Sequence, residues 1–170
     1  MEKRFTLVLL GPAGSGKSTF VAGLSKINIL QYVAAENYGG ANTTKVSTIY
    51  EFSRNFDSLV VSDCECELEE NREKILNELK DLSAQTNGIQ EIFSRINSPE
   101  FAKKCASLTI QLPCKEALLP NGCIYDTIVV RDNRGFGDVD DSSDINVAEL
   151  GITYDVNAIL FFLISQIQQP

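Results

Sequence analysis

The chain contains no histidine among its 170 residues. This absence excludes the commonest general base of enzymes, catalytic triads that include histidine, and histidine metal ligands. Any catalysis therefore has to rely on positioning, backbone N–H donors, lysine and a metal ion.

Long apolar segments and a surplus of basic residues are also missing. The longest apolar runs, residues 7–10 and 158–164, fall well short of the roughly 20 residues that a membrane-spanning helix needs. A secretory signal would overlap the glycine-rich motif that follows the first run. Fifteen basic and 23 acidic residues give a net charge of −8, which argues against a broad cationic surface for nucleic acid. We expect a single domain, residues 1–170, in the cytoplasm, without a transmembrane segment; peripheral membrane contact stays open.

The five cysteines form no recognisable framework. Their number is odd and their spacings are irregular, so no disulfide set is indicated. Cys64 and Cys66 have no second pair that would indicate a zinc site. We expect free thiols.

Residues 5–20 carry the strongest motif. An apolar run leads into Gly11, and Gly16, Lys17 and Ser18 complete the pattern G-x-x-x-x-G-K-[ST], which between a strand and a helix is typical of a phosphate-binding loop (P-loop). The glycines, Gly14 included, let backbone N–H groups surround a polyphosphate, and the following helix adds its positive dipole end. Lys17 is expected to reach the β- and γ-phosphates, and Ser18 to bind Mg²⁺. The full set of predicted phosphate-binding residues is Gly11, Gly14, Ser15, Gly16, Lys17, Ser18 and Thr19.

The remaining sequence predicts an α/β domain. Strands are expected at 5–10, 46–52, 58–61, 106–112, 124–130 and 156–164, the last of them buried, and helices at 17–25, 68–82 and 88–96, with a short one beginning at 98–100. Residues 33–44 are rich in turn formers and predict a loop. Strands 106–112 and 124–130 could form a hairpin around the Pro120-Asn121-Gly122 turn.

Asp132 follows the apolar run 124–130, with only Arg131 between them. Ligands of open α/β sheets bind at the carboxyl ends of the strands, which makes this carboxylate the second candidate site residue. With Gly135 it forms an Asp-x-x-Gly motif, and Thr43 and Thr44 lie in the loop between the two motifs.

The order of these three elements resembles that of P-loop GTPases, most closely the G domain of dynamin-type GTPases, with septin-like and immune-associated GTPases as neighbours. The resemblance implies a P-loop NTPase fold: a mostly parallel three-layer α/β/α sheet with an antiparallel edge, in which residues 53–125 are an insertion. It also implies GTP hydrolysis to GDP by a switch or mechanoenzyme that could form a homodimer or a larger assembly. The family's guanine-recognition motif would follow strand 156–164, so we expect the chain to be the N-terminal part of a longer domain.

The resemblance further implies specific roles. Ser18 and Thr44 would bind Mg²⁺, with Thr43 as the less favoured alternative, and Asp132 would hold the ion through water. Lys17, Thr44 and the Gly135 amide would act on the γ-phosphate. Dynamin-type domains carry Gln-Ser where this chain has Ala13 and Gly14, and proline where it has Arg134. The differences predict hydrolysis that is slow or that depends on a partner, a dimer or Arg134.

Two other functions fit the same motifs. In the first, the chain is an ATP-using ATPase or nucleotide kinase in which Asp132 is the acidic residue that holds the metal. In the second, it is a scaffold that binds the nucleotide without hydrolysing it. Preference for ATP over GTP would favour the ATP-using enzyme. Absence of phosphate release would favour the scaffold.

Overall fold

A computed structural model describes residues 2–12, 15–33, 46–132 and 155–162. Most of the predicted elements are present, with small shifts at their ends. In chain order they are β1 (Arg4–Leu10), α1 (Lys17–Leu24), α2 (Leu30–Val33), β2 (Ser47–Ser53), β3 (Val60–Glu65), α3 (Glu69–Ser83), α4 (Gly88–Ile96), α5 (Pro99–Ala102), β4 (Ser107–Pro113), η2 (Glu116–Leu118), β5 (Thr127–Asp132) and β6 (Ala158–Phe161). Ser98 caps α5 as expected, because its side chain accepts the Phe101 N–H.

The six strands form one mixed sheet in the order β3-β4-β2-β5-β1-β6. β1 pairs in parallel with both β5 and β6, and β2 pairs in parallel with β4. Antiparallel pairs join β2 to β5 and β3 to β4. The expected antiparallel edge is therefore present at β3, but a second antiparallel junction lies inside the sheet. The α/β class is confirmed.

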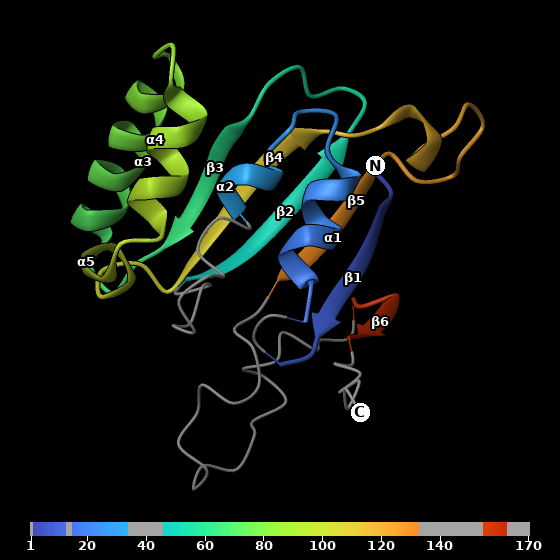
Figure 1. Cartoon of the computed structure of the whole chain (residues 1–170), viewed down its shortest axis with the longest axis horizontal. Helices are drawn as coiled ribbons and strands as arrows, with labels where there is room; N and C mark the ends of the chain where they lie inside the picture. The colour runs from blue at the N-terminus through green and yellow to red at the C-terminus, as the bar shows by residue number, and fades with distance from the viewer. Residues whose placement is uncertain (1, 13–14, 34–45, 133–154, 163–170) are drawn as a thin grey trace, which may run out of the picture.

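Helices α1, α2, α3 and α4 lie over one face of the sheet (Figure 1). Residues that alternate along the strands point to this face, for example Leu108, Ile110 and Leu112 of β4, all of which are buried. They share one core with Val21 of α1 and with apolar residues of α3 and α4, namely Ile75, Leu79, Ile92, Phe93 and Ile96. Among the described residues there is no second helical layer, so the three-layer architecture stays an expectation.

The prediction that β4 and β5 could form a hairpin is wrong. β2 lies between β4 and β5, because it is buried along most of its length and can pair on both sides. The connection from β4 to β5 passes around the end of β2, where the carbonyl of Ser53 accepts the Cys114 N–H at 3.2 Å. The Ser53 hydroxyl donates to the carbonyl of Asp126 at 3.0 Å.

β6 also differs from expectation. It was expected to be buried, but it forms an edge of the described sheet, and Phe161 remains 65% exposed. An apolar run of four residues pairs with β1 on one side only, so apolar composition alone did not reveal the position of the strand.

Replacing Leu79 with alanine tests the helix-covered core. Leu79 is fully buried in α3, and removing such a side chain from a packed core costs about 2–5 kcal/mol. Leu68, which is 62% exposed beside the same helix, is the matched control, and Leu68→Ala should change the free energy of unfolding by less than about 1 kcal/mol. Equal losses in denaturant unfolding would contradict the assigned packing.

Candidate functional site

The glycine-rich loop joins the carboxyl end of β1 to the start of α1 (Figure 1). Gly11 has φ +153°, and a Cβ there would lie 2.6 Å from the carbonyl oxygen of Phe162 and 2.9 Å from Ser15 Oγ. Gly16 has φ +95° and is the N-cap of α1. Both conformations strongly favour glycine. The backbone at these two positions therefore favours the glycines that define the motif.

The first turn of α1 is suited to an anion. The N–H groups at the start of a helix have no partner within the helix, and the dipole places partial positive charge there. Lys17, Ser18 and Thr19 occupy this turn, which contains no acidic side chain. The Ser15 hydroxyl beside it is buried and has no hydrogen-bond partner among the described residues. These features supply the donors that a phosphate group needs.

Lys17 is folded back onto the loop. Its ammonium group donates to the carbonyl of Gly11 at 2.8 Å and to that of Pro12 at 3.0 Å. Only 6% of the residue is exposed, and hydrogen bonds offset the desolvation of a buried charge. The positive charge is thus held against the carbonyls of Gly11 and Pro12.

Asp132 lies beside the loop because of strand register. β1 and β5 run in parallel and pair Leu9 with Asp132, so the loop after β1 and the last residue of β5 reach the same edge of the sheet. There the Ser18 hydroxyl donates to Asp132 Oδ2 at 3.0 Å. Two residues predicted separately from sequence are brought into direct contact.

The Asp132 carboxylate is held in an unfavourable environment. It is 1% exposed, and its Oδ1 has no hydrogen-bond partner among the described residues. Burial raises the pKa of the Asp132 carboxyl to about 6, although the Ser18 hydrogen bond and the charge of Lys17 oppose the rise. A buried carboxylate oxygen without a partner, next to a serine hydroxyl, fits the hard oxygen ligands that Mg²⁺ prefers.

A small pocket of about 20 Å³ adjoins Ser18 and Asp132. Its volume suits one water molecule or ion, so a nucleotide would have to lie outside it. Thr48 and Tyr50 of β2 line the pocket. The pKa of Tyr50 is raised, mainly because the hydroxyl is buried and also because the Asp132 charge lies nearby. Sequence reasoning missed these two residues. Their alternate positions in a strand were visible, but the antiparallel pairing of Thr48 with Asp132 was not.

The structure places part of the predicted site. Gly11, Lys17, Ser18 and Asp132 lie together, and Ser15, Gly16 and Thr19 lie at the same helix start. Gly14, Thr44 and Gly135 are outside the described residues, and their roles stay predictions.

A second cluster was not foreseen. Cys105 lies beside Cys64 and Cys66, and their three sulfur atoms are within 4.8 Å of one another. All five cysteines are free thiols, as expected. The sequence shows Cys64 and Cys66 as an adjacent pair, but Cys105 is distant in the chain and joins them only through the pairing of β3 with β4.

Comparisons with known proteins add no relative: no family model, no curated protein and no solved structure matches the chain. In the described part of the chain, no helix has both the length and the apolar character that crossing a membrane requires.

An Asp132→Asn variant should separate stability from ligand binding. At neutral pH the folded chain holds a carboxylate whose pKa burial raises to about 6, which costs about 3 kcal/mol. We expect the neutral amide to leave the ligand-free protein equally stable or to raise its free energy of unfolding by up to about 3 kcal/mol. Denaturant unfolding at pH 7 measures this. Exposed Asp57 is the control, and Asp57→Asn should have little effect. A loss of more than about 1 kcal/mol on Asp132→Asn alone would refute the unfavourable burial.

Proposed function

We propose that the chain binds a nucleoside triphosphate with Mg²⁺ and hydrolyses GTP to GDP, as a switch or a dynamin-like mechanoenzyme. The observation that carries the proposal is the contact between Ser18 and Asp132 at 3.0 Å. It joins the end of a complete P-loop motif to a buried carboxylate on the neighbouring parallel strand. The P-loop motif assigns Ser18 to the metal ion, and the resemblance to P-loop GTPases assigns Asp132 to it.

The phosphates would bind over the start of α1. The N–H groups of the first turn and the Ser15 hydroxyl are donors. The Lys17 ammonium group is held by two loop carbonyls. If phosphate oxygens replaced these carbonyls, the ammonium group would keep its hydrogen bonds and its positive charge would be paired with a negative one.

Ser18 and Asp132 would hold the magnesium ion. Its bound charge would neutralise part of the negative charge on the phosphates and offset the buried charge of Asp132. The chain itself would contribute by holding the phosphates in position and by placing the Lys17 charge against the group that leaves. Thr44 as a further magnesium ligand and the Gly135 amide at the γ-phosphate belong to the same proposal.

The choice of guanine rests on the resemblance to dynamin-type GTPases in the order of the P-loop, the threonine loop and Asp132-x-x-Gly135. The absence of histidine agrees with a reaction in which positioning and charge neutralisation do most of the work. GTPase function thereby stays compatible with every described residue of the site.

Competition between nucleotides tests the substrate. A fluorescent GTP analogue is bound in the presence of Mg²⁺ and displaced with unlabelled GTP, ATP or UTP. We expect GTP to displace it at a concentration at least about tenfold below that of ATP, a difference of about 1.4 kcal/mol. Tighter binding of ATP would replace the GTPase proposal with that of an ATP-using enzyme.

Release of phosphate tests catalysis. Lys17→Ala should reduce Mg²⁺-dependent GTP hydrolysis by about 100-fold or more, the usual effect of losing one group that stabilises transition-state charge. Lys26, exposed just beyond α1, is the matched control, and Lys26→Ala should retain normal turnover. Nucleotide binding without any phosphate release by the wild-type chain would indicate a non-hydrolysing scaffold instead.

A further inference from the structure

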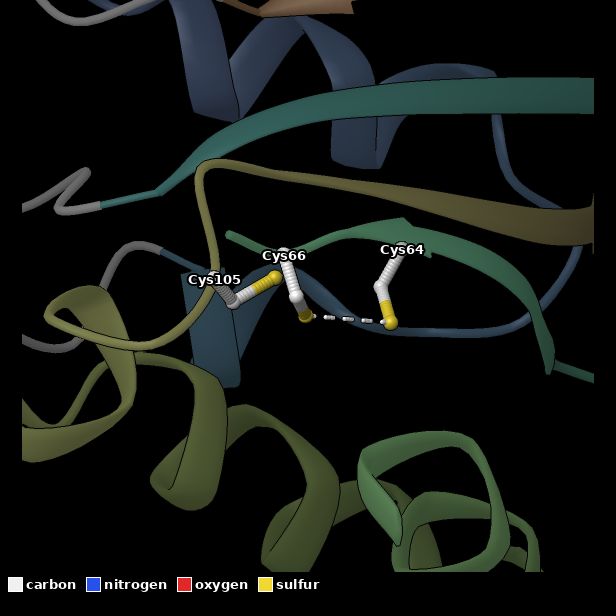
Figure 2. Close-up of side chains that lie close together, drawn as sticks. All are labelled: Cys64, Cys66 and Cys105. Atoms are coloured by element: carbon white, nitrogen blue, oxygen red, sulfur yellow. Dashed lines mark hydrogen bonds between the residues drawn. The ribbon is translucent and has the colours of Figure 1, made fainter. Parts of the chain in front are cut away.

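Three cysteines at the adjoining ends of two neighbouring strands meet on the side of the sheet that the helices cover (Figure 2). Cys64 lies near the end of β3, Cys66 directly follows that strand, and Cys105 precedes β4. The Cys64 and Cys66 sulfur atoms are 3.7 Å apart, and all three sulfur atoms lie within 4.8 Å of one another. The sulfur atoms therefore converge on one small volume.

The backbone holds this arrangement in place. The N–H of Ala106 donates to the carbonyl of Glu65 at 2.8 Å, which joins the residue between the first two cysteines to the residue after the third. The Ser107 hydroxyl also donates to the Glu65 carboxylate at 3.1 Å. The hydrogen bond from Ala106 to Glu65 thus fixes the segment that carries Cys64 and Cys66 against the segment that carries Cys105.

The spacing matches a metal ion bound by thiolates. In a tetrahedral zinc site with Zn–S bonds of about 2.3 Å, neighbouring sulfur atoms are about 3.8 Å apart. The distance between Cys64 and Cys66 already has this value, and Cys105 would need to move by about 1 Å or less to complete the set. Rotation of a cysteine side chain can supply such a shift.

The fold encloses most of the cluster. Cys64 and Cys105 are buried. The neutral thiols donate weak hydrogen bonds: Cys64 to the carbonyl of Arg72 at 3.7 Å and Cys105 to that of Ser107 at 3.1 Å. Cys66 is only partly buried, which leaves a path by which an ion can enter.

We propose that Cys64, Cys66 and Cys105 form a binding site for one thiophilic metal ion, with Zn²⁺ as the divalent ion that fits. The three thiols would each release a proton as the three sulfur–metal bonds form. Water or another external ligand at the partly exposed side would complete a tetrahedral shell.

This site is separate from the one proposed for magnesium. Thiolates select soft metals, whereas Mg²⁺ selects oxygen ligands. The strand order places β4, β2 and β5 between β3, which carries Cys64, and β1, which leads into the phosphate loop. The metal site therefore stands whether or not the nucleotide proposal does.

Cadmium titration of the reduced, metal-free chain tests the site, because Cd²⁺–thiolate bonds absorb in the ultraviolet. We expect one Cd²⁺ per chain, displaced by Zn²⁺ but not by excess Mg²⁺. Cys66→Ser, the substitution that disturbs the core least, should weaken Cd²⁺ binding by more than about 100-fold, beyond the usual effect of changing an outer-shell residue. Cys123→Ser, at another partly buried cysteine, and Lys17→Ala should bind as the wild type does.

Cys105→Ala, which removes a second ligand of the same site, should also weaken Cd²⁺ binding. Circular dichroism checks that each variant is folded. Zn²⁺ should also raise the midpoint of thermal unfolding of the wild type and not that of Cys66→Ser, because a ligand stabilises only the state that binds it. Absence of Cd²⁺ binding by the fully reduced wild type, or wild-type absorbance in Cys66→Ser, would overturn the proposal.

Discussion

The parallel pairing of β1 with β5 determines what the candidate site can be. It sets Leu9 opposite Asp132, and so brings the loop after one strand to the carboxylate that ends the other. The Ser18 hydrogen bond to Asp132 then joins the start of α1 to this edge of the sheet. Without this register, a glycine-rich turn and an acidic residue more than a hundred positions later would be unrelated features of the sequence.

The site combines favourable and unfavourable electrostatics. Lys17 satisfies its charge with loop carbonyls, whereas Asp132 is buried with one oxygen that has no hydrogen-bond partner among the described residues. Natural proteins commonly retain such unfavourable groups where function requires them. A divalent cation would relieve the cost at Asp132, and a polyphosphate would pair with Lys17. Because the cation and the phosphates attract each other, each would strengthen the binding of the other.

The sequence predicted local features better than pairing. Continuous apolar residues before Gly11 and helical spacing in 68–82 and 88–96 identified β1, α3 and α4, because local periodicity reflects burial. The position of β2 between β4 and β5 and the exposure of β6 depend on contacts between distant segments, which no local pattern encodes. Lys17, Ser18 and Asp132 were found from motifs, whereas Tyr50 and Cys105 became visible only when strand register placed them.

Magnesium-dependent nucleotide binding tests the central claim most directly. Isothermal titration calorimetry would compare GTP with Mg²⁺ and GTP with EDTA, on the wild-type chain, Ser18→Ala and the exposed control Ser62→Ala. A site built on Ser18 and Asp132 predicts that Mg²⁺ strengthens binding to the wild type and to Ser62→Ala, and that Ser18→Ala loses this gain. Wild-type binding that is equal with Mg²⁺ and with EDTA, or a full gain in Ser18→Ala, would contradict it.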